Sequence, residues 1–185
     1  VYLGYRYAET RYEDVVLKTA NTGSFDYSSS VKYSFGFGKS YTEFSYGKFE
    51  KKYDEASDTY TFTVDVKNVG GVAGKEVVQV YLQQSYTEYD KINHIEKPSV
   101  ELVGFAKTKK LKPDESEAVT VKVEGRSLAA YDAYTAKTYY LDAGDYYFAL
   151  GNGAHDALNN ILAAKGKTTA DGMTENGNAA LVQKE

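Results

Sequence analysis

Two histidines and a group of aspartates are the side chains in this sequence that could carry out catalysis. His94 and His155 lie far apart in the sequence and outside any cluster with metal-ligand spacing, so we expect a local hydrogen bond or a solvated loop position for each. Asp132, Asp142 and Asp145 could supply a carboxylate pair for acid–base chemistry. They fall in turns and at strand ends, however, and nothing in the sequence places two of them across a sugar ring. The sequence therefore predicts no catalytic residue in this chain.

The sequence also predicts no metal site and no cofactor. Cysteine is absent, which excludes disulfides, thiolate catalysis and cysteine-ligated metals. The glycine motifs at 36–38 and 151–153 are too short for phosphate-binding loops, and neither opens a helix after a parallel strand. A cysteine-free chain is compatible with the cytoplasm, but cysteine-free secreted domains also exist, so the compartment stays open.

Tyrosine is the one residue type abundant enough to suggest binding, since the 185-residue chain contains 19 of them. Tyr86 and Tyr89 lie in SYTEYDK, in the longest loop between predicted strands, where exposed rings could stack on carbohydrate. The alternative is that these rings pack against a neighbouring domain or fill the edge of the fold. We favour this alternative, because a large, rigid, amphipathic ring suits any interface.

The stretch YSFGFGKSYTEFSY at residues 33–46 could be a ligand platform, a strand or a packed joint between two units. Its glycines argue against a simple strand, and its position before the first predicted strand favours a joint. We therefore predict that Phe35, Phe37, Tyr41 and Phe44 pack the N-terminal segment onto the rest of the fold, and that they are largely buried or face a domain interface.

The elements that must position these residues are mostly strands. TYTFTVDVKN at residues 59–68 alternates apolar and polar side chains with a period of two, as in a half-buried strand. KEVVQVYLQQ at 75–84 is apolar on both faces, which predicts a central strand. The glycines of NVGGVAG at 68–74 predict that these two strands form a tight hairpin.

Further strand patterns occur at residues 45–53, 100–107, 117–124, 137–142 and 145–151. We interpret Gly104 as a bulge, Pro113 as part of a turn, and Ala143-Gly144 as the turn of a second hairpin. About seven short strands at this spacing predict an all-β fold, an immunoglobulin-like or fibronectin type III-like β-sandwich.

The two ends of the chain differ from this strand region at residues 45–151. Residues 1–44 are aromatic and irregular in period, and we interpret them as an N-terminal extension containing the joint. Residues 152–185 are expected to hold a short helix at 155–166 and a polar linker, disordered without a neighbouring domain.

Two residues fit the ends of the predicted helix, and a third concerns the chain as a whole. Asp156 could cap the start of the predicted helix and Gly166 its end. Because the numbering starts at Val1, we interpret the chain as a segment of a longer gene product.

The charge pattern argues against two classes of partner. The net charge is −4 and the lysines are scattered among acids, so no basic stripe is present that would hold nucleic acid. No apolar run approaches the roughly 20 residues needed to cross a bilayer. We therefore expect neither a nucleic acid nor a membrane partner.

Five segments carry a resemblance to a known family: GYRYAETRYED (4–14), YSFGFGKSYTEF (33–44), VKNVGGVAGKEVVQVYL (66–82), VELVGFAKTKKLKPDES (100–116) and YYLDAGDYYFALG (139–151). In this order they resemble the end of the α/β sandwich and the whole fibronectin type III-like domain of glycoside hydrolase family 3, the β-glucosidase family. The family's usual YPFGYGLSYT has Ser34, Phe37 and Lys39 here at its proline, tyrosine and leucine positions. These departures concern turns and packing.

The resemblance implies a parent enzyme that hydrolyses terminal β-linked sugars by a retaining mechanism. Its aspartate nucleophile would lie on a (β/α)8 barrel and its acid/base on the α/β sandwich, and neither motif matches a segment of this chain. The chain alone is therefore expected to be a non-catalytic accessory domain, with the barrel and the α/β sandwich as its partners. The resemblance to members with a permuted domain order would make residues 155–185 a connector to the barrel, and residues 1–44 the remnant of the preceding α/β sandwich together with the joint. The alternative is a carbohydrate-binding or adhesion module that uses the tyrosine-bearing loops.

Overall fold

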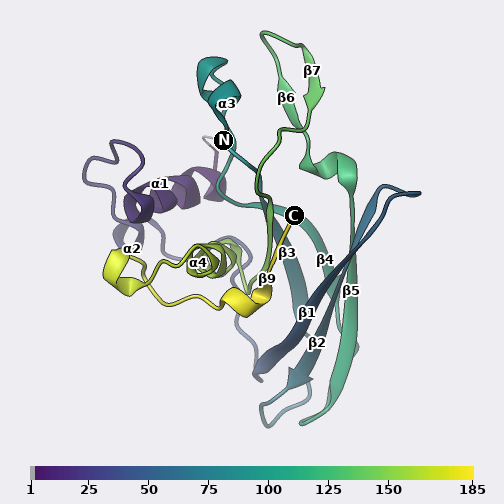
Figure 1. Ribbon diagram of the computed structural model, residues 1–185. Helices are drawn as coiled ribbons and strands as arrows, with labels where there is room; N and C mark the ends of the chain where they lie inside the picture. Colours follow the sequence, from purple (N-terminus) through teal and green to yellow (C-terminus); the bar gives the residue numbers. More distant parts are fainter. Residues whose placement is uncertain (1–2) are drawn as a thin grey trace.

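The computed structural model describes residues 3–185 and shows two antiparallel β-sheets packed face to face, with helices behind the second sheet (Figure 1). The first sheet has the order β1-β2-β5, with β1 at Phe44–Asp54, β2 at Thr59–Asn68 and β5 at Ser116–Glu124. The second sheet has the order β4-β3-β8-β9, with β4 at Glu101–Lys107, β3 at Val77–Gln83, β8 at Tyr147–Leu150 and β9 at Val182–Lys184. The predicted all-β sandwich is confirmed.

The core between the two sheets is built from side chains that alternate along each strand. On β2, Tyr60, Phe62, Val64 and Val66 are all buried, as their spacing of two predicted. Phe62 packs against Phe148 of β8 across the sandwich, with ring centroids 4.7 Å apart. Burial of each such side chain contributes about 1.5–3 kcal/mol, so these contacts hold the two sheets together.

Behind the second sheet lies a helical layer with its own apolar core (Figure 1). Its helices are α1 at Tyr5–Leu17, α2 at Tyr27–Ser30 and α4 at Ala154–Ala164. Leu158 and Ile161 of α4 and Tyr12 of α1 pack with Tyr81 and Ala149 of the sheet, and all five side chains are buried. Strand β3 is therefore covered on both faces, as its apolar pattern predicted.

Helix α1 was not predicted from the sequence, because the N-terminal extension at residues 1–44 is irregular in its apolar period. The first two residues of that extension lie outside the described residues. The inward face of α1 carries Tyr12 and Val16, but also Glu9, which is fully buried. This carboxylate interrupts the apolar spacing by which an amphipathic helix is recognised.

The predicted helix at 155–166 is confirmed, and Gly166 follows its end with a positive φ of 77°. Its start differs from the prediction. Gly153 is the capping residue, and the carboxylate of Asp156 instead accepts a hydrogen bond from the Asn152 N–H at 2.8 Å.

The predicted hairpin at 68–74 is wrong, because β2 and β3 belong to different sheets. Asn68 holds the crossing: its side-chain nitrogen donates to the carbonyls of Val72 and Leu111, and its side-chain oxygen accepts from the Gly70 N–H. A glycine-rich turn permits a crossing between sheets as readily as a hairpin, and here the hydrogen bonds of the Asn68 side chain favour the crossing.

The second predicted hairpin, at Ala143-Gly144, is also wrong. Strand β7 at Thr138–Tyr140 pairs with β6 at Ala130–Asp132, whereas β8 pairs with β3 and β9. The expected bulge is present, since the pairing of β3 with β4 shifts register between Gly104 and Leu102.

The C-terminal segment is ordered against the sandwich, contrary to the expected disordered linker. It contains the short helices η2 at Thr169–Asp171 and η3 at Ala179–Leu181, and then strand β9, which extends the second sheet. Met173 and Leu181 are buried. These two side chains are spaced too far apart to form a periodic pattern, and together with the pairing of β9 with β8 they hold this segment in place.

One end of the sandwich carries a projection made of α3 at Glu88–Ile92 and the β6–β7 hairpin (Figure 1). The short helix η1 at Gly125–Leu128 connects it to β5. Within residues 3–185, no helix combines the length and the hydropathy that a membrane span requires.

Candidate functional site

The joint at residues 33–44 is held in place by its backbone and by one polar side chain. The carbonyl of Phe35 accepts a hydrogen bond from the Ala154 N–H at the start of α4, at 2.8 Å. At the other end, the buried hydroxyl of Thr42 donates to Asn68 Oδ1 at 2.7 Å. The segment thus connects the helical layer to the sandwich, as a joint should.

The aromatic side chains of this joint point outward. Phe35, Phe37 and Tyr41 are 44%, 50% and 99% exposed, so they are not buried within the chain as predicted. Phe44, the first residue of β1, is half-buried against the sandwich core. The joint is anchored by backbone atoms and by Thr42, so the rings of Phe35, Phe37 and Tyr41 stay partly or fully exposed, and a place for them at a domain interface stays a prediction.

Four exposed rings lie close together in this part of the chain, and we call them the aromatic face: Tyr33, Phe35, Phe37 and Tyr41. Tyr33 stacks on Phe37 with centroids 5.5 Å apart, and Phe35 stacks on Tyr5 of α1 at 4.2 Å. Apolar side chains gathered on a surface in this way mark contact sites for another molecule or domain.

Tyr89, one of the two predicted carbohydrate contacts, is committed to a structural role. Its hydroxyl donates to Asp132 Oδ2 at 2.6 Å, and its ring packs edge-on against Tyr140. Asp132 also accepts the backbone N–H groups of residues 134–136. These hydrogen bonds, that of Tyr89 first, hold the pKa of Asp132 well below its usual range.

The other two aspartates considered for catalysis also have structural partners. Asp142 accepts from Thr87 and from Lys97, and Asp145 pairs with Lys184 at 2.7 Å. Lys97 itself is almost fully buried between two carboxylates, so it fixes the loop before β4. Among the residues the structure describes, no group of three acidic or histidine side chains could hold a metal ion.

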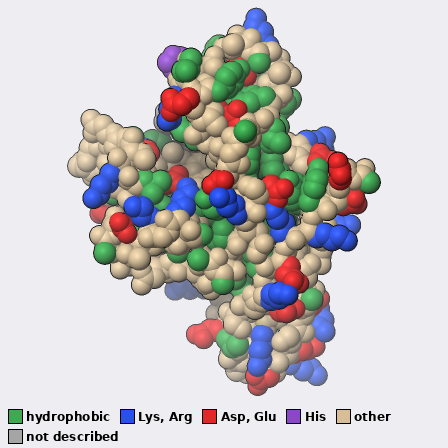
Figure 2. Space-filling model, viewed as in Figure 1, with side chains coloured by type: hydrophobic (Ala, Val, Ile, Leu, Met, Phe, Trp, Pro, Cys, Tyr) green, Lys and Arg blue, Asp and Glu red, His purple; other side chains and the backbone are tan. Residues whose placement is uncertain are grey.

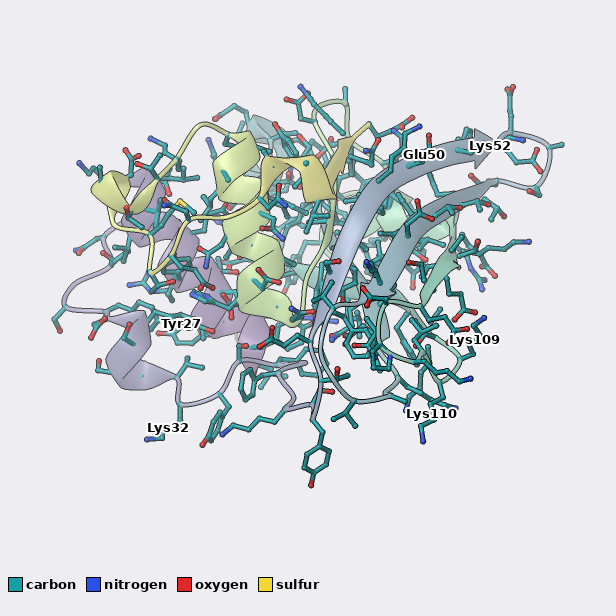
Figure 3. The ribbon with its side chains drawn as sticks, turned by 90° about the horizontal axis from the view of Figure 1, so that it is seen from below. Tyr27, Lys32, Glu50, Lys52, Lys109 and Lys110 are labelled. Carbon is teal, nitrogen blue, oxygen red and sulfur yellow. The ribbon has the colours of Figure 1, made fainter. Side chains whose placement is uncertain are left out.

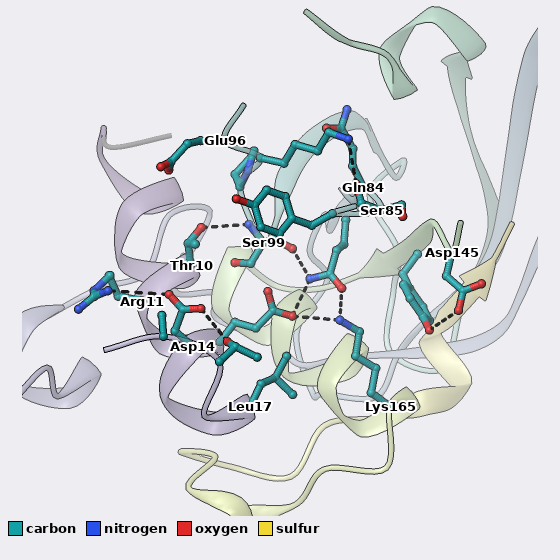
Figure 4. A pocket seen from close by; sticks show the side chains of 18 of the residues that line it. Thr10, Arg11, Asp14, Leu17, Gln84, Ser85, Glu96, Ser99, Asp145 and Lys165 are labelled. Atoms are coloured by element: carbon teal, nitrogen blue, oxygen red, sulfur yellow. Dashed lines mark hydrogen bonds and ion pairs between the residues drawn. The ribbon is translucent and has the colours of Figure 1, made fainter. Parts of the chain in front are cut away.

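Tyr86, the second predicted carbohydrate contact, lines a cleft of about 900 Å³ between α1 and the segment that connects β3 to β4 (Figure 4). Its ring is half-exposed and its hydroxyl has no hydrogen-bond partner among the described residues. Burial, aided by the charge of Glu96, raises the pKa of this hydroxyl. The hydroxyl of Tyr86 is therefore unpaired, whereas that of Tyr89 is paired with Asp132, and a contact of either ring with carbohydrate stays a prediction.

The floor of this cleft is an ordered polar network (Figure 4). Gln83 is buried, and its Nε2 donates to Glu13 at 2.9 Å and to the Ser99 carbonyl at 2.7 Å. Lys165 bonds both Glu13, at 3.0 Å, and the side-chain oxygen of Gln83. Because these groups satisfy one another, they form a fixed surface under the cleft.

A buried polar cluster connects α1, α2 and α4 within the helical layer. It was not predicted from the sequence. His155 lies between Glu9, 2.8 Å from its Nδ1, and Thr174, 2.7 Å from its Nε2. Tyr27, which is labelled in Figure 3, also donates to Glu9 at 2.5 Å, and its ring stacks on that of His155. This order of carboxylate, imidazole and hydroxyl resembles a catalytic triad.

The contacts of Thr174 favour a structural role for this cluster. Its hydroxyl also lies 3.3 Å from that of Tyr12 and 3.4 Å from Asn159 Nδ2. A hydroxyl enclosed by three partners has no free position for attack on a substrate. The expectation of a local hydrogen bond at His155 is confirmed, but the partners come from segments that only the fold brings together.

The projection carries a second group of exposed aromatic rings. Figure 2 shows hydrophobic side chains at this end of the molecule, at the top of the view. On the β6–β7 hairpin, Tyr131, Tyr134 and Tyr139 are each more than half exposed. His94 follows α3 with a positive φ and has no ion-pair or hydrogen-bond partner for its ring among the described residues.

Residues 76–154 match the family model of the fibronectin type III-like domain. A curated β-glucosidase of Ruminococcus albus is 34% identical over 161 residues, which is 85% of this chain and 14% of that protein. This chain contains a fibronectin type III-like domain of the β-glucosidase type. The domain extends beyond the matched range, since β1 and β2 precede residue 76 and β2 pairs with β5 inside it.

Solved structures of β-glucosidases share this fold. The enzyme from Paenibacillus barengoltzii is 35% identical with a TM-score of 0.65, over 83% of this chain and 15% of that one. A GH3 β-glucosidase of Bifidobacterium adolescentis is 28% identical with a TM-score of 0.63, over 83% of this chain and 19% of that one. The fibronectin type III-like chain thus spans less than a fifth of the length of these relatives, and the resemblance inferred from its five segments is confirmed.

Proposed function

We propose that this chain is a non-catalytic accessory domain of a glycoside hydrolase family 3 enzyme that resembles a β-glucosidase. In this role it packs against the barrel and the α/β sandwich of the parent enzyme and stabilises their arrangement. Its own carboxylates take no part in hydrolysis, since Asp132, Asp142 and Asp145 are each held by hydrogen bonds or ion pairs within the domain.

The aromatic face is the observation that carries this proposal. A half-exposed Phe37 and a fully exposed Tyr41 lie at the joint between the helical layer and the sandwich, where a neighbouring domain would connect. Covering apolar surface contributes about 25 cal/mol per Å² of area removed from water. Rings fixed by an anchored backbone lose little conformational freedom when a partner covers them, which favours a permanent domain contact.

Mixing the chain with separately purified catalytic domains of the parent enzyme tests the proposal. We expect their thermal midpoint to rise by several degrees, because a partner that binds only the folded state stabilises it. A variant carrying both Phe37→Ser and Tyr41→Ser should lose this effect. The control is Tyr134→Ser, which removes a 76% exposed ring from the β6–β7 hairpin and should leave the effect intact.

Two results would contradict the proposal. If the thermal midpoint does not change on mixing, the chain does not stabilise the catalytic domains. If the purified chain alone hydrolyses an aryl β-glucoside, it is not an accessory domain.

A further inference from the structure

The cleft beside Tyr86 contains the two unsatisfied buried groups of the described chain. Within residues 3–185, only Arg11 Nε and Ser99 Oγ are buried side-chain polar atoms without a hydrogen-bond partner, and both residues line this cleft. Ser99 is only 4% exposed. Leaving a buried polar atom unpaired is unfavourable, so two such atoms at one site indicate that something else pairs with them.

Two further polar groups at the cleft are also without a partner. The carboxylate of Glu96 forms no hydrogen bond or ion pair in the described part of the chain, and neither does the hydroxyl of Tyr86. Figure 4 shows Ser99 and Thr10 on the wall of the cleft, with Glu96 at its edge. The cleft therefore offers one obligate donor at Arg11 Nε, one obligate acceptor at Glu96, and two hydroxyls that can do either.

The charges of the cleft do not select a charged ligand. Acidic and basic side chains line it in equal number, four of each. Most of them already form ion pairs, either within the cleft, as Lys165 does with Glu13 at 3.0 Å, or with groups outside it, as Lys97 does with two carboxylates. A ligand with a net charge would gain little here and would lose its hydration.

We propose that this cleft binds a neutral ring with several hydroxyl groups, of the size of one or two hexopyranose units. Each hydroxyl of such a ligand both donates and accepts, which matches the mixed set of free groups at Arg11, Ser99 and Glu96. The exposed ring of Tyr86 supplies the flat apolar surface on which the C–H face of a pyranose stacks. The volume of about 900 Å³ lies within the range of small-molecule sites, roughly 300–1,000 Å³.

This site is separate from the proposed accessory function. No residue of the aromatic face lines the cleft, so a domain contact through that face leaves the cleft open. The loss of either property in an experiment would therefore leave the other unaffected.

Amide chemical shifts of the 185-residue chain, titrated with glucose and with cellobiose in a buffer free of polyols, test the proposal. We expect shifts at residues 10–11 and 96–99, with saturation. Tyr86→Ala removes an exposed ring without disturbing the core and should weaken binding about tenfold. Tyr134→Ala, on the β6–β7 hairpin, is the matched control and should bind like the unchanged chain.

Glucose 6-phosphate provides the charged counterpart and should bind more weakly than glucose. Three results would overturn the proposal: no saturable shift with either neutral sugar, binding that Tyr86→Ala leaves unchanged, or binding of the phosphorylated sugar alone.

Discussion

Single carboxylates determine the stability of two parts of this molecule, and Asp132 does so for the β6–β7 hairpin. Its side chain accepts one hydroxyl and three backbone N–H groups, which lower its pKa below the value of about 3.9 expected in an unfolded chain. A carboxyl whose pKa is lowered by folding stabilises the fold above the unfolded value. This contribution is lost as the pH falls through the folded pKa.

A pH titration of the amide signals of residues 134–136 tests this role. We expect these signals to stay constant from pH 7 to below about pH 4, and to shift together only at lower pH, when Asp132 is protonated. Asp132→Asn should abolish that common shift. Signals that already move near pH 4 would show that the carboxyl titrates normally and does not fix the hairpin.

Glu9 has the corresponding role in the helical layer. Glu9→Ala leaves the Tyr27 hydroxyl and one nitrogen of His155 without their buried partner, so we expect a loss of about 3–5 kcal/mol in the free energy of unfolding, measured in urea. Glu9→Gln retains an oxygen acceptor in the same place and should cost less. A loss below about 1 kcal/mol for Glu9→Ala would contradict a structural role for the cluster.

At the scale of single residues, the sequence could not identify hydrogen-bond partners. It predicted a local hydrogen bond or a solvated loop position for His155, yet Glu9 and Thr174 are too distant in the sequence to be recognised as its neighbours. Tyr86 and Tyr89 looked equivalent, because both lie in one loop. Only the fold distinguishes them, because the hydroxyl of Tyr89 bonds to Asp132 whereas Tyr86 lines the cleft.

Among the elements, the C-terminal segment differs most from its prediction: it packs closely against α4, although its polar composition predicts a disordered linker. Gly177 lies so close to α4 that an added Cβ would be 2.0 Å from the Asn159 carbonyl oxygen. Gly177→Ala should therefore displace the segment and lower the free energy of unfolding by about 1–3 kcal/mol. The control is Gly71→Ala, where an added Cβ meets nothing within 4 Å.

Chemical denaturation of the two glycine variants provides the measurement for this prediction. If both variants unfold at the same denaturant concentration as the unchanged chain, the segment is not held against α4. In that case the expectation of a loose linker, made from its polar composition, would be the better description.

Strands were predictable from the sequence where one face is buried, and their connections were not. The alternation at 59–68 gave β2 with its bounds, because apolar side chains on one face and polar ones on the other define a half-buried strand. The partner of each strand depends on contacts such as those of Asn68, which ties together segments on either side of the crossing. Period and glycine content carry no information on that choice.

For the molecule as a whole, two groups of exposed rings lie in separate places, and we propose that only one of them contacts a neighbouring domain. The aromatic face is at the joint between the layers, whereas the tyrosines of the β6–β7 hairpin are on the projection (Figure 1). A domain contact through the joint would cover the first group and leave the second exposed. The cleft beside Tyr86 would stay accessible in either case.

Hydrogen exchange of the backbone amides, compared between the isolated chain and its mixture with the catalytic domains of the parent enzyme, tests the accessory role most directly. We predict slower exchange in peptides covering residues 33–44 and unchanged exchange in peptides covering the β6–β7 hairpin, because only the aromatic face becomes buried. Equal exchange at residues 33–44 in both samples, or protection of the hairpin alone, would contradict the account.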